Sequence, residues 1–256
     1  MRRSSPFRRR FRIGLVTFWT LVVAWMAFNL QARGVPDATL ESGAAVTVTR
    51  TSDAVEFTPV PDTARVGLVL YPGSLVDPVA YAPLARDIAE AGYRAVILPL
   101  AFRQAPTADH QLALFERTLA VRNGAPGRAW IVGGHSRGGA LAARFARDHE
   151  GSLDGLLLIG TSHPREDDLS GLAIDVTKVF GSEDGLVSEE EVRQFAPLLP
   201  RATHWERIEG GNHAQFGWYG WQLGSGTATI SREAQHAATV GAVRRQLDRV
   251  ARATAP

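Results

Sequence analysis

Ser136 lies at the centre of the motif Gly134-His135-Ser136-Arg137-Gly138, which fits the pattern G-x-S-x-G. An apolar run, AWIVGG, leads into the motif, and a run of small residues, GGALAARFAR, follows it. This context is typical of a strand that turns sharply into a helix and presents a serine nucleophile at the turn. A glycine-rich packing turn or a phosphate-binding loop is the alternative, although the spacing fits neither a P-loop nor G-x-G-x-x-G. We interpret Ser136 as a nucleophile, which needs a neighbouring base at neutral pH.

The elements that must position Ser136 alternate between strands and helices from about residue 44 onwards. Most strands are continuous apolar runs, which favours a mostly parallel sheet covered by helices on both faces. Two short β-branched runs at the front predict an antiparallel edge hairpin. The expected strands are 45–49, 55–58, 66–71, 93–98, 129–133, 156–159, 176–180 and 203–208. The expected helices are 78–91, 108–121 (with Leu112, Phe115 and Leu119 on one side), 137–149 and 231–253, together with a short one capped by Ser188 and Glu191.

A serine motif between a strand and a helix of such a sheet resembles the α/β-hydrolase superfamily, and the resemblance covers roughly residues 44–255. It is closest to small, lidless esterases of the dienelactone-hydrolase type. The resemblance implies that an acid and then a histidine follow the serine along the chain, each in a loop after a strand. It also implies one catalytic domain over 44–256. No cap domain is expected, because only residues 163–173 separate two of the later strands.

Asp184 matches the acid that the resemblance implies, because FGSEDGLV follows an apolar strand. Its carboxylate would orient the histidine and stabilise the imidazolium. The alternative is a turn aspartate that bonds to its own backbone. Glu183 is the second candidate for the acid. Three other aspartates fit less well, since they precede the strand or lie in a polar loop: Asp167, Asp168 and Asp175.

His213 matches the general base, because EGGNHAQF follows the last expected strand and precedes the closing helix. His163 lies in a loop and could line a pocket. The remaining histidines fall in expected helices, in a strand or in the serine motif: His110, His135, His149, His204 and His236.

Two backbone amides are expected to stabilise the oxyanion of the tetrahedral intermediate. One belongs to Arg137, directly after the nucleophile. By resemblance the other belongs to Ser74, with Leu75 next in line, although Tyr71-Pro72 stands where relatives have His or His-Gly-Gly. Four residues are expected to contact substrate: Leu75, His163, Phe216 and Trp218. The aromatic segment 216–221 has two further interpretations, a loop pinned by buried rings and an interfacial contact.

Residues 13–30 contain no charged side chain and would span ~27 Å as a helix, close to the hydrocarbon thickness of a bilayer. Six arginines precede this run, which favours a cytoplasmic amino terminus. We therefore expect a basic tail over 1–12, a transmembrane anchor over 13–30, a linker over 31–43 and a domain outside the cytoplasm. The alternatives are a cleaved export signal and, less in keeping with the flanking arginines, a buried core helix.

Composition excludes several functional classes. The chain has no cysteine, so disulfides, thiolate zinc sites, Fe–S clusters and cysteine nucleophiles are ruled out. Seven of its 28 basic residues lie within residues 1–33, which leaves 21 basic against 26 acidic residues in the remainder. That acidic balance argues against a nucleic-acid partner. No metal-binding spacing such as H-E-x-x-H occurs, and no cofactor is expected.

The sequence thus predicts a serine hydrolase that cleaves a small-molecule carboxylic ester through an acyl-enzyme. Two alternatives remain open. One is an acyltransferase on the same fold, and the other is a catalytically silent, membrane-tethered binding module.

Overall fold

Eight strands form one sheet in the order β1-β2-β4-β3-β5-β6-β7-β8 in the computed structural model, which describes residues 6–255. The two leading strands pair antiparallel with each other, β2 also pairs antiparallel with β4, and all other neighbours are parallel. The mostly parallel sheet with an antiparallel edge hairpin is confirmed. The strands are β1 (Val46–Arg50), β2 (Val55–Pro59), β3 (Val66–Tyr71), β4 (Arg94–Ile97), β5 (Ala129–His135), β6 (Gly155–Ile159), β7 (Asp175–Gly181) and β8 (His204–Ile208).

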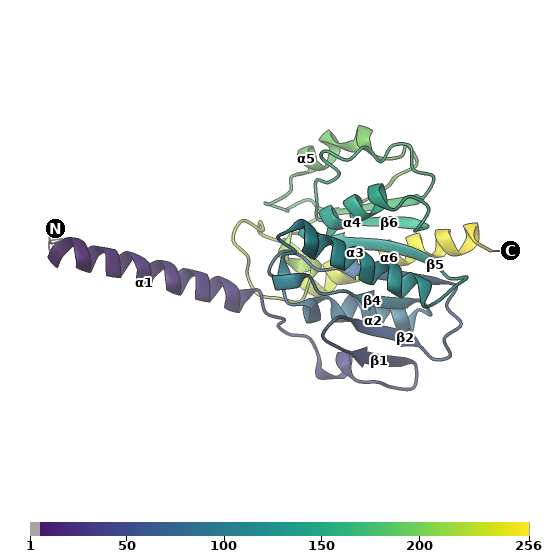
Figure 1. Cartoon of the computed structure of the whole chain (residues 1–256), viewed down its shortest axis with the longest axis horizontal. Coiled ribbons are helices and arrows are strands. Elements are labelled where there is room, and N and C mark those ends of the chain that lie inside the picture. The colour runs from purple at the N-terminus through teal and green to yellow at the C-terminus, as the bar shows by residue number, and fades with distance from the viewer. Residues whose placement is uncertain (1–5, 256) are drawn as a thin grey trace.

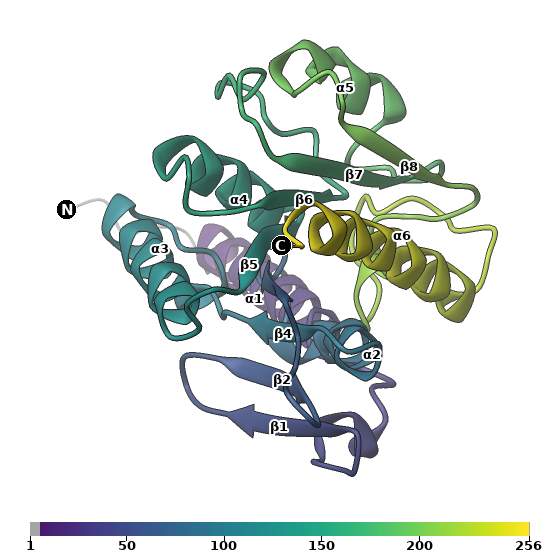
Figure 2. The same cartoon turned by 90° about the vertical axis from the view of Figure 1, so that its right-hand side faces the viewer.

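Helices cover both faces of the sheet, as Figure 2 shows. One face carries α2 and α6, and the other carries α3, α4 and α5. The α-helices are α1 (Pro6–Asn29), α2 (Ala82–Glu90), α3 (Ala108–Asn123), α4 (Arg137–Asp148), α5 (Glu189–Gln194) and α6 (Arg232–Ala253). Short 3-10 turns also occur: η1 (Asp37–Leu40), η2 (Pro78–Tyr81), η3 (Ala101–Arg103), η4 (Ala196–Leu198) and η5 (Ala214–Phe216).

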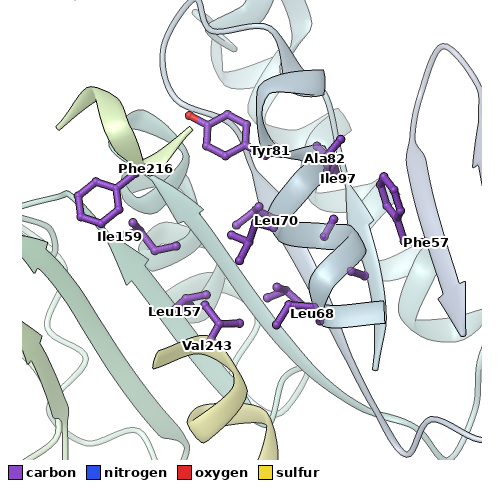
Figure 3. Close-up of a cluster of buried hydrophobic side chains, with 14 of the residues drawn as sticks. Phe57, Leu68, Leu70, Tyr81, Ala82, Ile97, Leu157, Ile159, Phe216 and Val243 are labelled. Atoms are coloured by element: carbon purple, nitrogen blue, oxygen red, sulfur yellow. The ribbon is translucent and has the colours of Figure 1, made fainter. Parts of the chain in front are cut away.

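Strand β3 shows why the central strands are continuously apolar. Leu68 and Leu70 point to the core beneath α2 and α6, which Figure 3 shows together with Ile97 and Val243. Val69 and Tyr71 point to the opposite core beneath α3 and α4. Both faces are therefore buried, and alternation of polar and apolar residues disappears.

The buried face of α3 differs from the expected one. Phe115 is buried and Leu119 is partly buried against the same core, as expected, but Leu112 is 54% exposed, and Leu114 and Thr118 are buried as well. Thr118 shares a hydrogen bond of 2.5 Å with the buried Tyr71 hydroxyl. Apolar periodicity alone does not predict the burial of Thr118, because its partner is a hydroxyl group on a distant strand.

The amino-terminal helix α1 extends away from the sheet, as Figure 1 shows. It begins at Pro6 instead of Ile13 and so includes four arginines, Arg8, Arg9, Arg10 and Arg12. Among the residues that the structure describes, no helix is long and apolar enough to cross a membrane. The transmembrane helix expected over 13–30 is therefore unsupported. The first five residues of the expected basic tail lie outside the described range.

Between β6 and β7 the chain runs through residues 160–174 as turns and coil, within the described range. Within the described residues, no inserted helix or strand covers the carboxyl ends of the parallel strands there.

The capping signal predicted for the short helix α5 is confirmed, because Ser188 and Glu191 form the expected capping box.

Gly67 in β3 permits the close approach of a buried ring. A Cβ at this position would lie 2.4 Å from the indole of Trp130, which is fully buried. Gly67→Ala should therefore destabilise the fold by about 1–3 kcal/mol, because overpacking a rigid core displaces its neighbours. The free energy of unfolding from urea titration measures this effect.

Gly171→Ala is the matched control, because a Cβ at residue 171 meets no atom within 4 Å. It should change the free energy of unfolding by less than about 0.5 kcal/mol. Equal stability of the two variants would contradict the packing argument.

Candidate active site

Ser136 occupies a strained turn between β5 and α4. Its backbone has φ 52° and ψ −114°, a conformation that non-glycine residues rarely adopt. The neighbouring glycines make the turn possible. A Cβ on Gly138 would lie 2.1 Å from the Tyr71 carbonyl oxygen, and one on Gly134 would lie 2.3 Å from the Gly138 carbonyl carbon. The strand–turn–helix context expected for the motif is therefore present, with the Ser136 residue partly exposed.

Asp184 and His213 form a buried pair at the same edge of the sheet. Asp184 follows β7 and His213 follows β8. The His213 Nδ1 to Asp184 Oδ2 distance is 2.8 Å, and both side chains are almost completely buried. The other carboxylate oxygen, Oδ1, accepts hydrogen bonds from the amides of Leu186 and Val187, each at 2.9 Å. The carboxylate is thus held by three donors.

The other acidic candidates lie elsewhere. Glu183 is exposed and contacts Ser182. Asp175 lies at the opposite end of β7, where it pairs with Arg249. Asp167 pairs with Arg147, and Asp168 accepts from the Ser170 amide. Of the carboxylates singled out from the sequence, only Asp184 meets His213.

The Nε2 atom of His213 is available for a proton. Because Nδ1 donates to Asp184, Nε2 carries a lone pair, and this buried atom has no hydrogen-bond partner among the described residues. The His213 ring lies 4.5 Å, centroid to centroid, from the ring of His135, the residue directly before Ser136. The Ser136 hydroxyl does not donate to Nε2 in this structure. Such bonds are commonly long without substrate and tighten when it binds.

The turn after β3 has one free amide. The Gly73 amide donates to the Tyr81 hydroxyl at 2.9 Å, and the Leu75 amide donates to the Arg103 carbonyl at 2.6 Å. Within the described residues the Ser74 amide has no acceptor, which favours Ser74 over Leu75 as an anion donor. The Arg137 amide, in the first turn of α4, is likewise one of the amides that a helix leaves unpaired.

Two pockets adjoin these elements. A pocket of about 220 Å³ opens beside Ser74 and Leu75 and is mainly apolar; its walls include Trp25, Met26, Leu30, Trp221 and Leu223. A second pocket, of about 280 Å³, is lined by His163 and by several charged residues of α4 and the 160–174 loop. Leu75 and His163, both expected to contact substrate, each line one pocket.

The two aromatic candidates have different positions. Phe216 is buried with its ring 5.5 Å from that of His135. Trp218 donates from Nε1 to His236 of α6 at 3.3 Å, and its carbonyl accepts from the Arg33 amide. Trp218 thus connects α6 to the chain that follows α1 and lines neither pocket, which fits the interpretation of a pinned loop.

Sequence reasoning missed the contribution of α1 to the apolar pocket. The Trp25 and Trp221 rings lie 5.3 Å apart, and the Asn29 carbonyl accepts from the Gly220 amide at 2.7 Å. The only signal was the aromatic composition of both segments, which does not show that they meet.

Sequence reasoning also missed Lys178, which supports the 160–174 loop through a hydrogen bond. It is fully buried in β7, and its Nζ donates to the His163 carbonyl at 2.7 Å. Burial, followed by repulsion from Arg165, lowers the pKa of Lys178 to about 7. A lysine in the middle of the apolar run DVTKVF is the signal that could have identified it.

The arrangement contains a serine at a sharp turn, a histidine oriented by a carboxylate and free amides at the carboxyl edge of a wound sheet. Residues 67–237 match the model of the family described as "Alpha/beta hydrolase family". The chain belongs to the alpha/beta hydrolase family. No curated protein is similar enough to count as a relative. Among the described residues, no group of three or more His, Asp or Glu is arranged to hold a metal ion.

Solved structures show the same fold. A predicted CIB-like hydrolase from Thermoplasma acidophilum is 16% identical with a TM-score of 0.60, and the match covers 79% of this chain and 100% of that one. A ferulic acid esterase from Streptomyces cinnamoneus is 19% identical with a TM-score of 0.59, covering 73% and 67%. A protein from Klebsiella pneumoniae subsp. pneumoniae, provisionally assigned as a dienelactone hydrolase, is 15% identical with a TM-score of 0.59, covering 80% and 99%. The resemblance seen in the sequence is confirmed.

Lys178→Met should change how stability depends on pH. The folded amine loses its proton near pH 7, whereas in the unfolded chain it stays protonated to about pH 10.4. Below pH 7 both states are charged and the folded state bears the full cost of the buried charge. Between these two values the unfolded state binds more protons, so the wild-type protein gains stability relative to Lys178→Met as pH rises.

The measurement is the free energy of unfolding of both proteins at several pH values from about 6 to 10, the window set by the two pKa values. Lys178 is the only lysine in the chain, so the difference isolates one lysine titration. A difference that does not vary with pH would show that the buried amine stays charged.

Proposed function

We propose that this protein is a serine hydrolase that cleaves carboxylic esters, with Ser136 as nucleophile, His213 as general base and Asp184 as the orienting acid. The observation that carries the proposal is the buried hydrogen bond of 2.8 Å from His213 to Asp184, beside a strained serine in a glycine-lined turn. Membership of the alpha/beta hydrolase family supports it.

In the first half-reaction, His213 Nε2 takes the Ser136 proton while Oγ attacks the ester carbonyl carbon. Asp184 keeps the second ring proton on Nδ1 and stabilises the imidazolium. The amides of Arg137 and Ser74 bind the oxyanion of the tetrahedral intermediate. Collapse of the intermediate breaks the C–O bond, His213 gives its proton to the departing alkoxide, and the acyl group stays on Ser136.

In the second half-reaction, water takes the place of the alcohol. His213 removes a proton from water as the water oxygen attacks the acyl-enzyme, and the same amides bind the second oxyanion. Collapse returns the proton to Ser136 Oγ and releases the carboxylic acid. The apolar pocket beside Ser74 and Leu75 suits an alkyl part of the substrate, since it is walled by tryptophan and leucine side chains.

Ser136→Ala should abolish covalent labelling by a fluorophosphonate probe and lower the turnover of 4-nitrophenyl acetate to near background, because the attacking oxygen is removed. Asp184→Asn should lower kcat by roughly 10⁴-fold, because the amide no longer fixes the histidine tautomer. Labelling is followed by intact-protein mass spectrometry and turnover by nitrophenolate absorbance.

Ser170→Ala is the matched control, an exposed serine of the 160–174 loop whose replacement should leave labelling and turnover unchanged. Continued labelling of the Ser136→Ala protein would refute Ser136 as the nucleophile. Product analysis with an added alcohol separates hydrolysis from acyl transfer.

Tyr81 connects the oxyanion turn to the serine turn. Its buried hydroxyl accepts from the Gly73 amide at 2.9 Å and bonds to His135 Nδ1 at 2.7 Å. The Tyr81 hydroxyl thus links the main chain of the turn after β3 to the ring of the residue directly before Ser136. Burial lowers the pKa of His135 far below its usual value, and the nearby His213 lowers it further, so this ring stays neutral. Tyr81 is therefore a positioning residue.

Tyr81→Phe should lower kcat by roughly tenfold with little change in KM, less than the 10²–10³ expected for deleting an oxyanion donor outright. The reason is that the Gly73 amide loses its acceptor and the neighbouring Ser74 amide loses its fixed direction. Tyr71→Phe is the matched control, since that hydroxyl bonds to Thr118 on the opposite face of the sheet. It should lower stability and leave kcat unchanged. Equal kcat values for wild type and Tyr81→Phe would contradict the positioning role.

A further inference from the structure

The charged pocket of about 280 Å³ lies between α4 and the 160–174 loop. Arg137 and Arg144 line it from α4, at positions separated by seven residues and therefore on the same side of the helix. His163 and Arg165 line it from the loop. Two segments that line the pocket lie next to Ser136, as the following links show. Arg137 directly follows Ser136, and the Ser136 amide donates to the carbonyl of Ile159, four residues before His163.

Two of the guanidinium groups have no carboxylate partner among the described residues. Arg137 donates only to the main-chain carbonyls of Gln104 and Ala105, each at 3.4 Å, which is the long end of the hydrogen-bond range. Arg144 donates to the side-chain amide oxygen of Gln111 at 2.9 Å. Both side chains are partly exposed to the pocket, so their charges are neither neutralised nor fully hydrated.

The carboxylates at the pocket do not cancel these charges. Asp167 is committed to an ion pair with Arg147, and Glu166 is exposed at the rim. Arg165 donates to Ser162 at 2.7 Å and lies 3.7 Å from Glu191. The two α4 arginines therefore give the lining of the pocket a local excess of positive charge.

The pKa of His163, which lines the pocket, is also affected by these positive charges. Burial, followed by the nearby positive charges of Arg165, Lys178 and Arg137, lowers the pKa of His163 to about 4, against a smaller opposite effect of Asp167. His163 is neutral at pH 7, so it can share a hydrogen bond with a bound group without adding charge.

We propose that this pocket is an anion subsite that binds a carboxylate on the ester substrate, with Arg137 and Arg144 as its direct partners and Arg165 at its entrance. The inference rests on the proposed ester hydrolysis and deepens it by naming the substrate class. Guanidinium groups match planar carboxylates in shape and charge. A singly charged carboxylate suits the site better than a dianionic phosphate, because Glu166 and Asp167 also line the pocket.

The test compares esters that differ only in charge. On the acyl side the pair is mono-(4-nitrophenyl) glutarate and 4-nitrophenyl valerate, which share a leaving group and acyl chain length. On the alcohol side the pair is 4-acetoxybenzoate and 4-methylphenyl acetate, each of which has a single ester bond. Each kcat/KM is divided by the rate of hydroxide hydrolysis of the same ester, which removes differences in intrinsic reactivity. In the wild-type protein the anionic member of at least one pair should be preferred.

Arg144→Gln and Arg165→Gln should each lower the ratio of anionic to neutral kcat/KM, the first by roughly tenfold, because a hydrogen bond to a charged group is lost. Arg252→Gln is the matched control. Arg252 is exposed in the last turn of α6 and does not line the pocket, so its replacement should leave the ratio unchanged. An unchanged ratio in Arg144→Gln and Arg165→Gln with both ester pairs would overturn the proposal.

A binding measurement separates this proposal from the proposed function. Monomethyl glutarate is titrated into the wild-type protein and into Arg144→Gln, with arginine Nε–Hε resonances followed by NMR. Weaker binding to Arg144→Gln supports the subsite even if no ester is hydrolysed, in which case only the proposed function fails. Equal binding to both proteins overturns the subsite even if esters are hydrolysed.

Discussion

The close approach of α4 to the carboxyl end of β3 is the constraint on which the rest of the site depends. Gly138 meets the Tyr71 carbonyl so closely that any side chain would collide with it, and a Cβ on Gly139 would lie 2.7 Å from the Thr161 side chain. Only with both glycines can the first turn of α4 enter between the ends of β3 and β6. That entry holds Ser136 at positive φ and places the Arg137 amide near the turn that follows β3.

Several polar groups near the carboxyl ends of the parallel strands have fixed hydrogen-bond partners. The amides of Gly73 and Leu75 and the carboxylate of Asp184 are satisfied by fixed partners. Among the described residues, the Ser74 amide and His213 Nε2 have no hydrogen-bond partner, and both are groups of the kind that the proposed reaction needs. A buried polar atom without a partner is costly, so the unpaired Nε2 of the buried His213 is an argument for function.

The sequence predicted what depends on local pattern. β3 coincides with its expected range because burial on both faces produces an unbroken apolar run, and the Ser188–Glu191 box is set by neighbours along the chain. The free amide of the turn after β3 could not be derived in the same way. It depends on the Arg103 carbonyl and the Tyr81 hydroxyl, which reach the turn from other elements. The face of α3 was wrong at Leu112 for the same reason, since Thr118 is buried by a partner on β3.

Both pockets are products of the tertiary fold, and their contrast has a chemical consequence. The apolar one needs Trp25 of α1 to meet Trp221, and the charged one needs the 160–174 loop to lie against α4. Lys178 fixes part of that loop from beneath through the His163 carbonyl, so a buried charge in β7 supports the wall of a charged pocket. The apolar pocket adjoins the proposed oxyanion donor Ser74, whereas the charged pocket begins at Arg137. A substrate held by both pockets would therefore have its apolar group and its anionic group on opposite sides of the ester. The length of the substrate between these two groups, more than either pocket alone, would set which esters fit.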